Sequence, residues 1–342
     1  MIREAIEHVL AGNDLDRSTA RAVMDRLMSG EVSPVRIAAL LTALRAKGES
    51  VAEITGFAEA MRGRAERVTL KRGDAVDTCG TGGDGGGTFN ISTAAAFVAA
   101  GAGAAVAKHG NRAVSSRSGS ADVLEALGVN LNISPVRAGA LIDEIGLGFL
   151  FAPAHHPAMK HVAPVRRELG LRTVFNVLGP LTNPAGVKRQ VIGVFAGGLC
   201  EPLARVLAEL GAERAFVVHG QDGLDEVSLT SPTLVAELRD GEVKLSTFQP
   251  EDMGLTLCSA ADLTGGTPEQ NATILTAILD GEKGPRTDAV LLNAAFALTA
   301  AGVVDGVADG LNAARDAVAD GRAACVLSAL REATNNDTEV GS

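Results

Sequence analysis

Six glycines crowd into the eight residues from Gly80 to Gly87, in the run DTCGTGGDGGGTFNIST that begins at Asp77. Glycine has no Cβ and adopts positive φ readily, so consecutive N–H groups of such a loop can turn inward around an anion. The loop leads into Asn90-Ile91-Ser92-Thr93 and an alanine-rich run, which predicts a helix start. A helix N-terminus behind a glycine loop favours phosphate, so the stretch predicts a phosphorylated ligand.

Cations and hydroxyls follow the next apolar run. Residues 104–107 lead into Lys108-His109-Gly110-Asn111-Arg112, and serines stand at positions 115, 116 and 118. Adjacent parallel strands bring the loops that follow them to one edge of a sheet. We therefore expect Lys108 and Arg112 to neutralise phosphate oxygens beside the glycine loop, although a solvated turn would carry the same residues.

Two carboxylates, Asp225 and Glu226, follow a strand-like run that ends at His219. In a loop such neighbours can converge, and magnesium is held by one or two carboxylates together with substrate phosphates. The alternative is an acidic surface turn.

The segment from Phe151 to Pro184 carries five prolines, which exclude a long regular helix. Short helices and loops crossing between domains are expected, a natural place for a substrate cleft. An arginine of the pair Arg166-Arg167 could fork a substrate carboxylate there, or both could be surface charge. The histidines at 155, 156 and 161 are expected to line the cleft rather than to bind metal, because no carboxylate or cysteine joins them.

Other known glycine-loop sites fit less well. The Rossmann pattern formed by Gly80, Gly82 and Gly85 requires an acidic residue after the next strand, where Lys108-His109 stands instead, and no Gly-Lys-Ser/Thr closes a Walker loop. A flexible linker is disfavoured because apolar strands frame the loop. Cys79 is expected to be a buried strand residue rather than a nucleophile.

These loops need a scaffold, and apolar runs alternating with helical patterns after residue 74 predict an α/β domain with a central, mostly parallel sheet flanked by helices. Strands are expected at 75–79, 104–108, 148–151, 190–195 and 215–219, then a hairpin over 233–248, then three helices from 267 to about 330. Four short helices before it predict a small helical bundle. We expect a helical domain at 1–70 joined by the cleft segment 152–184, an α/β domain at 71–334, and a disordered tail at 335–342.

Composition excludes several classes of function. The 342 residues carry a net charge of −10 with no tryptophan or tyrosine, which speaks against nonspecific nucleic-acid binding and against stacking platforms. No apolar stretch is long enough for a membrane span and no signal peptide is evident, so a cytoplasmic location is expected. The four cysteines have no metal or disulfide spacing.

Taken together, the motifs resemble the anthranilate phosphoribosyltransferase family over nearly the whole chain. The matching stretches are GTGGDG at 80–85, NIST at 90–93, KHGNRAVSS at 108–116, GSADVLE at 119–125, HPAM at 156–159, PVRR at 164–167, Asn176 with LGP at 178–180, and GLDE at 223–226. Arginine at 117, where lysine is commoner, and Ala154 depart from the pattern.

The resemblance implies transfer of a phosphoribosyl group from 5-phosphoribosyl 1-pyrophosphate to the amine of anthranilate, the second step of tryptophan biosynthesis from chorismate. It implies no covalent nucleophile, with His109 as the candidate proton acceptor, and a homodimer formed through the helical domain. Two magnesium ions per subunit are expected, one on Ser92 and one served by Asp225 and Glu226. Gly80, Asn111 and Arg166 are expected to contact anthranilate. The expected donor-binding residues are Gly80, Gly83, Asp84, Thr88, Asn90, Ile91, Ser92, Thr93, Lys108, His109, Gly110, Asn111, Arg112, Ala113, Val114, Ser115, Ser116 and Ser120.

Two alternatives remain open at this point. A pyrimidine nucleoside phosphorylase shares the architecture but uses inorganic phosphate, and its reaction would not need the Asp225-Glu226 pair. A non-enzymatic nucleic-acid-binding relative of the same fold should show a basic surface, whereas this chain is acidic.

Overall fold

The computed structural model describes residues 1–82, 87–113 and 117–336. The expected site residues Gly83, Asp84, Val114, Ser115 and Ser116 lie outside the described residues, as does most of the expected tail.

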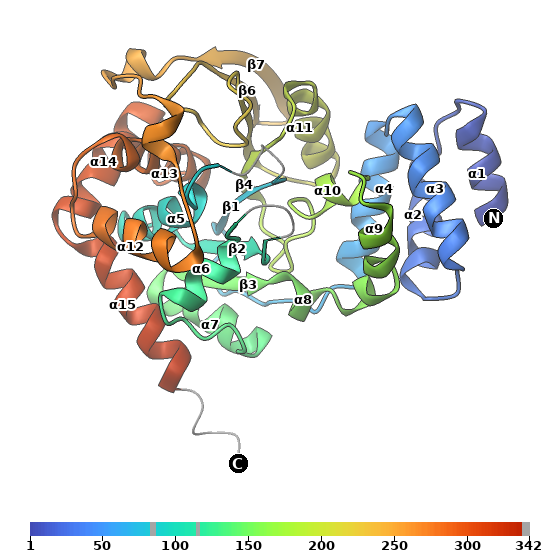
Figure 1. Ribbon diagram of the computed structural model, residues 1–342, viewed down its shortest axis with the longest axis horizontal. Helices are drawn as coiled ribbons and strands as arrows, with labels where there is room; N and C mark the ends of the chain where they lie inside the picture. The colour runs from blue at the N-terminus through green and yellow to red at the C-terminus, as the bar shows by residue number, and fades with distance from the viewer. Residues whose placement is uncertain (83–86, 114–116, 337–342) are drawn as a thin grey trace.

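The first four helices form a bundle at one end of the molecule (Figure 1). They are α1 (Ile2–Leu10), α2 (Arg17–Met28), α3 (Pro34–Lys47) and α4 (Val51–Gly63). Side chains fix where they begin: Asp16 accepts the Thr19 N–H at 2.9 Å, and Ser50 and Glu53 form a reciprocal capping box. The chain leaves this bundle after α4 and enters a larger α/β body.

The α/β body is built on one seven-stranded sheet with the order β3-β2-β1-β4-β5-β6-β7. The first five strands are parallel and the last two are added antiparallel as a hairpin. The expected fold, a helical bundle plus a mostly parallel sheet, is confirmed. The strands are β1 (Val76–Gly80), β2 (Val106–Gly110), β3 (Leu147–Phe151), β4 (Arg189–Gly193), β5 (Arg214–Gly220), β6 (Thr233–Arg239) and β7 (Glu242–Phe248).

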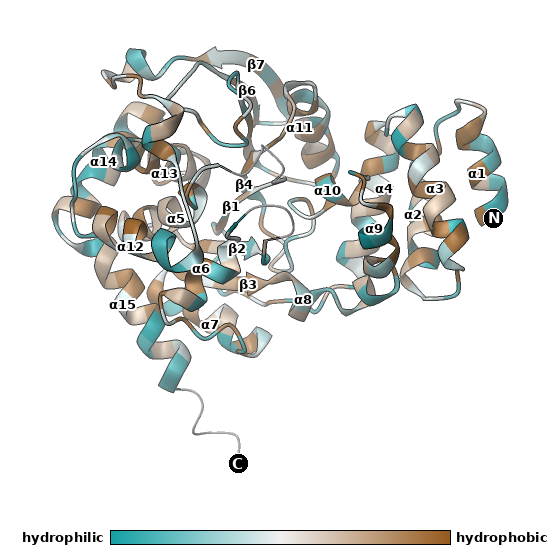
Figure 2. Cartoon of the chain, viewed as in Figure 1, coloured by the Kyte–Doolittle hydropathy of each residue, from teal (hydrophilic) through white to brown (hydrophobic). Residues whose placement is uncertain are grey.

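Both faces of the sheet are covered. Neighbouring residues along a strand point to opposite faces, so each face packs against different helices. Val191 packs with α5 (Ile91–Gly101) and α13 (Pro285–Ala301), while Ile192 packs with α11 (Cys200–Glu209) and the helical bundle. Figure 2 shows hydrophilic residues on many outward-facing segments, including α6 (Ser120–Ala126), α14 (Val307–Ala319) and the end of α15 (Arg322–Asn335). The bundle therefore shares a core with one face of the sheet.

Short helices make up the crossing segment, as its prolines predict. They are α8 (Ala152–His155), the 3₁₀ turn η1 (Pro157–His161), α9 (Ala163–Leu169) and α10 (Phe175–Leu178). Val162, Val165 and Phe175 are buried with the bundle helices, so this segment packs on the helical domain after leaving β3.

The last part of the chain corrects one expectation. Residues 268–335, which are described throughout, form four helices rather than three: α12 (Pro268–Leu279), α13, α14 and α15. Gly284 before Pro285 and left-handed Gly302 and Gly321 separate them. The last helix continues to Asn335, past the expected end.

The remaining elements complete the cover of the sheet. They are α6 (Ser120–Ala126), α7 (Pro135–Ile145) and the 3₁₀ turns η2 (Gly197–Leu199), η3 (Pro250–Met253) and η4 (Ala260–Leu263). Among the described residues, no helix has the length and apolar character needed to cross a bilayer.

Candidate active site

The strand order reverses direction at β1. From there the chain proceeds outward through β2 and β3 on one side and returns through β4 and β5 on the other. The loops that follow β1 and β4 therefore diverge at the carboxyl edge of the sheet, the position of the ligand crevice in open α/β folds. The glycine loop, which starts after Gly80, follows β1. The Lys108 loop, which contains Asn111 and Arg112, begins in β2. The acidic loop, which contains Asp225 and Glu226, follows β5.

The acidic loop lies directly against the glycine loop. The Gly82 N–H donates to Asp225 Oδ2 at 2.7 Å, although 143 residues separate the two. A Cβ on Gly80 would lie 2.4 Å from Asp225 Oδ2, and a Cβ on Gly193, at the end of β4, would lie 1.5 Å from the Asp225 carbonyl oxygen. Both strands thus end in glycine where the acidic loop must approach.

Glu226 reaches the start of α5. Its Oε1 accepts the Ser92 N–H at 3.1 Å. This N–H lies in the first turn of α5, where backbone amides have no acceptor within the helix. Burial of the carboxyl, together with the nearby charge of Asp225, raises the pKa of Glu226 to about 8. Two acids thus converge where a cation would relieve their repulsion.

Lys108 supplies the cation on the neighbouring strand. Its side chain is buried and its Nζ donates to the Thr78 carbonyl oxygen and, at 3.4 Å, to Ser92 Oγ. Burial lowers the pKa of Lys108, opposed by the charges of Asp77 and Glu226. The ammonium group therefore joins β1, β2 and the start of α5 at one point.

The acidic loop is held by Asn293, a residue that belongs to none of the sequence motifs. Asn293, from the buried helix α13, accepts the Val227 N–H at 3.0 Å and donates to the Val227 carbonyl oxygen at 2.9 Å. The sequence does hold one signal for it, because Asn293 stands in the mostly apolar stretch Ala289–Ala301, which is buried throughout.

The oxygen ligands suit magnesium bound together with substrate. Among the described residues no cluster of three histidine, cysteine or acidic side chains could hold a metal alone. Ser92, Asp225 and Glu226 offer one hydroxyl and two carboxylates within one hydrogen-bonded group. Magnesium accepts such partial sets because phosphates and water complete its shell.

The far arm of the glycine loop is fixed by the stretch after η4. Thr88 bridges to Thr264, and the Phe89 N–H donates to the Leu263 carbonyl oxygen at 3.2 Å. Asn271 Nδ2 donates to Asn90 Oδ1 at 2.9 Å, a partner for the expected site residue that the sequence did not reveal. Ile91 and Thr93 are buried in α5.

The Lys108 loop folds over α6. Asp122 accepts the N–H groups of Ala113 at 2.9 Å and Gly119 at 2.8 Å, and Ser120 Oγ donates to the Asn111 carbonyl oxygen at 3.3 Å. A Cβ on Gly110 would lie 2.2 Å from Ser120 Oγ, so glycine is required there.

Arg112 is less available to a phosphate than Lys108 is. Its guanidinium pairs with Glu125 and Asp122 and lies 5.5 Å from the centroid of the Phe151 ring. Those carboxylates raise its pKa above the usual range. A phosphate would have to compete with them, so Lys108 is the stronger candidate of the two.

His109 is buried beside a second imidazole. Its backbone N–H donates to Asp77 Oδ1 at 3.0 Å, and its ring centroid lies 5.2 Å from that of His156. Burial and the charge of His156 lower the pKa of His109 to about 3. The Nε2 atoms of both rings are buried without a hydrogen-bond partner. His109 is therefore a neutral and weak base.

Arg166 lies on α9, in the crossing segment. Its guanidinium is 5.1 Å from the Phe175 ring centroid, and burial lowers its pKa. Among the described residues, Arg166 has no carboxylate partner. Its neighbour Arg167 is exposed to solvent. Cys79 is half-buried at the end of β1, and desolvation raises the pKa of its thiol well above the usual range, which fits a strand residue rather than a nucleophile.

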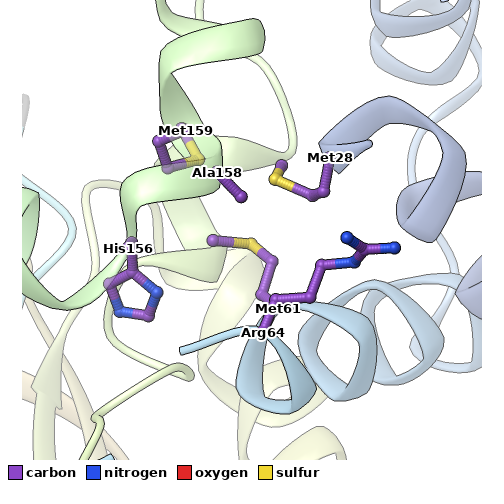
Figure 3. Close-up of a pocket in the computed structure, with 6 residues that line it drawn as sticks. All are labelled: Met28, Met61, Arg64, His156, Ala158 and Met159. Carbon is purple, nitrogen blue, oxygen red and sulfur yellow. The ribbon is translucent and has the colours of Figure 1, made fainter. Parts of the chain in front are cut away.

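A small cavity lies where the crossing segment meets the bundle (Figure 3). Its volume is about 10 Å³, room for one water at most. It is lined by Met28, Met61, Arg64, His156, Ala158 and Met159. This cavity is too small to hold a substrate.

Comparison with known proteins covers both parts of the chain. Residues 3–65 match the helical bundle domain of a glycosyl transferase family, and residues 72–324 match its a/b domain. Anthranilate phosphoribosyltransferase of Symbiobacterium thermophilum is 55% identical over 334 residues, 98% of either chain.

Solved structures agree over the same length. Anthranilate phosphoribosyltransferase from Thermus thermophilus is 49% identical with a TM-score of 0.92, covering 97% of this chain and 99% of its own. The Saccharomyces cerevisiae enzyme in complex with PRPP and Mg is 28% identical with a TM-score of 0.89, covering 98% of each chain. The same yeast enzyme has also been solved with 4-fluoroanthranilate, at 26% identity and a TM-score of 0.88 over 98% of each chain.

Proposed function

This chain belongs to the anthranilate phosphoribosyltransferase family, and we propose that the crevice beside β1 and β4 carries out that family's reaction. The enzyme transfers the phosphoribosyl group of 5-phosphoribosyl 1-pyrophosphate to the amine of anthranilate. The products are N-(5-phosphoribosyl)anthranilate and pyrophosphate, and the step belongs to tryptophan biosynthesis. The observation that carries the assignment to this crevice is the pairing of Asp225 with Gly82 and of Glu226 with Ser92.

The donor half of the site handles a leaving group. The C1–oxygen bond to pyrophosphate breaks as the new C1–nitrogen bond forms, so negative charge develops on the pyrophosphate. Lys108 and the positive end of the α5 helix dipole would stabilise it. Thr88, Asn90, Gly110, Asn111 and Ser120 would complete the donor site.

Magnesium completes the charge balance, and when bound it shields the pyrophosphate oxygens from the acidic loop. Ser92 would hold one ion, and Asp225 with Glu226 would serve a second. The raised pKa of Glu226 supports this role, because binding of a cation favours the ionised carboxylate.

The acceptor half of the site needs recognition more than acid–base help. Arg166 has no competing carboxylate among the described residues, so it is available to pair with the carboxylate of anthranilate. Asn111 and Gly80 would contact the same substrate. An aromatic amine carries little basicity, so it needs little help in losing its proton, and His109 with its low pKa is a weak acceptor for it.

We also propose that the subunits form a homodimer through the helical domain, that the domains divide near residue 70, and that the protein works in the cytoplasm. Exposed apolar side chains on α1 and α3, Leu10 and Val35, support the dimer.

The assay follows the loss of anthranilate fluorescence after addition of 5-phosphoribosyl 1-pyrophosphate and magnesium. We expect the signal to fall only with both present. The double variant Asp225→Asn/Glu226→Gln should need at least tenfold more magnesium for half-maximal rate, because two of the proposed ligands lose their charge. Asp222→Asn, in the same loop but bonded to Ser228 and Thr230, is the matched control. An unchanged magnesium titration in the double variant would refute the metal role.

A further inference from the structure

A second, cationic cavity lies away from the crevice. It has a volume of about 280 Å³ and is lined by Arg21, Glu59, Arg62, Gly63, Arg67, Glu209 and Leu210. Glu209 and Leu210 end α11, the helix that returns from the carboxyl edge of β4 to the start of β5. The cavity therefore opens at the amino edge of the sheet, opposite the candidate active site.

Both domains contribute to this cavity. Arg21 comes from α2 and Arg62 from α4, whereas Glu209 belongs to the α/β body, and α4 packs against α11. Arg67 lies in the connection that leaves the bundle. Figure 1 shows α4 between α2 and the α/β body. An occupant of this cavity would touch both domains at once.

The charges of the cavity are not balanced. Arg17 Nη2 lies 2.6 Å from Glu59 Oε1 and its Nη1 lies 2.9 Å from Glu209 Oε2, so one arginine engages both carboxylates. Arg21, Arg62 and Arg67 have no carboxylate within ion-pair distance in the described part of the chain. With Arg17 counted beside the three arginines that line the cavity, the positive charges exceed the two glutamates by two.

The guanidinium of Arg62 has one nitrogen left for a ligand. Its Nε donates to the Leu181 carbonyl oxygen at 2.6 Å and its Nη1 to that of Leu210 at 3.5 Å. Burial of this guanidinium lowers its pKa. A charge-assisted bond from Nη2, which makes no bond with a described residue, would offset that burial.

We propose that this cavity binds a small phosphate-type dianion and that the bound anion joins the helical domain to the α/β domain. Arginine is the residue best suited to phosphate oxygens, because its planar fork donates two parallel bonds. Two negative charges match the excess. The volume is close to the small end of ligand pockets, about 300 Å³, which suits a phosphate monoester. The site goes beyond the proposed reaction and uses none of its residues.

The test is equilibrium dialysis of the full chain with radiolabelled inorganic phosphate at fixed ionic strength. The double variant Arg21→Gln/Arg67→Gln is compared with Arg315→Gln/Arg331→Gln, which removes the same charge from exposed positions elsewhere. We expect wild type and control to bind one more phosphate per chain than the test variant, or to bind it at least tenfold more tightly. Phosphate held in the catalytic crevice contributes equally to all three proteins and cancels.

Melting temperature gives a second readout. Phosphate should raise it more for wild type and control than for Arg21→Gln/Arg67→Gln, because an anion that bridges two domains opposes their separation. Equal phosphate binding and equal melting shifts in all three proteins would overturn the proposal. Arg67→Gln alone, in the exposed connection, repeats the comparison if the double variant folds poorly. Anthranilate turnover without phosphate should be the same in all variants, so failure here is distinguishable from failure of the proposed reaction.

Discussion

Asp77 is a buried carboxyl that joins three segments of the chain. Its Oδ1 accepts the His109 N–H at 3.0 Å, and its Oδ2 accepts from Asn183 Nδ2 at 2.8 Å. Asn183 Nδ2 also donates to the Ala107 carbonyl oxygen at 2.8 Å. Asp77 and Asn183 are both buried, and together they fix the position of Lys108 and His109 in β2. At the residue scale the site thus depends on a support that carries no chemistry itself.

Titration of Asp77 should be visible in stability. Burial, opposed by Asn183, Lys108 and the His109 N–H, raises its pKa from 3.8 to about 6. The folded protein then holds this proton more tightly than the unfolded chain. The resulting stabilisation is complete below about pH 4 and is lost as the pH rises through about 6, a change of about 3 kcal/mol.

The measurement compares urea unfolding of wild type and Asp77→Asn from pH 4 to pH 7. We expect the free energy of unfolding of wild type to fall relative to the variant over this range. Asp74→Asn is the control, because Arg72 lowers the pKa of Asp74 and its effect should have the opposite sign. A constant difference between wild type and Asp77→Asn would show that Asp77 does not titrate in this window.

Arg166 should matter to one substrate only. Arg166→Ala is expected to raise the KM for anthranilate by roughly 10- to 100-fold, because a charge-assisted pair contributes about 1.5–3 kcal/mol. The KM for the phosphoribosyl donor should change by less than about threefold, since only anthranilate offers Arg166 a carboxylate.

Steady-state kinetics with each substrate varied in turn decides this. Arg167→Ala, the exposed neighbour on α9, should leave both constants near wild type. Equal increases for both substrates in Arg166→Ala would instead indicate a general distortion of the crossing segment.

At the scale of elements, the close approach of β1, β4 and the acidic loop sets the crevice. Gly80 and Gly193 end neighbouring strands in register, and both face Asp225. Asn293 from α13 holds Val227 of the same loop. Three elements thus determine one carboxylate position, which explains why the loop needs no regular structure of its own.

Gly193→Ala should disturb that position. Its Cβ would lie 1.5 Å from the Asp225 carbonyl oxygen, so the acidic loop must move. We expect the rate at saturating substrate to fall at least tenfold and the half-saturating magnesium concentration to rise. Gly198→Ala, with nothing within 4 Å of its Cβ, is the matched control. Wild-type magnesium dependence in Gly193→Ala would mean that the loop is not limited by β4.

At the scale of the whole molecule, the helical bundle shares its core with one sheet face and presents another side outward. Val35 is 79% exposed and Leu10 is 69% exposed, large values for apolar side chains. The proposed homodimer would cover them. The cationic cavity lies between the same bundle and α11, so assembly and anion binding would both act on the position of the bundle.

Val35→Asp should therefore weaken the dimer. Light scattering at micromolar concentration should give about twice 34.9 kDa for wild type and a value nearer one chain for the variant. A buried unpaired carboxylate is strongly unfavourable at an apolar interface. Val136→Asp, at an equally exposed valine on α7, should remain dimeric. A dimeric Val35→Asp would place the interface elsewhere.

Local sequence determined much of this protein. The capping residues Asp16 and Ser50 and the apolar runs of strand length depend only on neighbours in the chain, so the helical bundle and the parallel strands could be predicted. The number of helices after residue 267 is harder to predict, because the apolar pattern continues across the glycines that separate them. The sequence therefore predicts three helices where the structure has four.

Only the tertiary structure decided which charges are available and what surrounds them. Arg112 and Lys108 look alike in sequence, yet Arg112 pairs with Glu125 while Lys108 is buried beside Ser92. Asn293 and Asn183 support the site from segments without any motif. Such contacts join residues that are far apart in the chain, and they arise from how the sheet and helices pack, which no local pattern records.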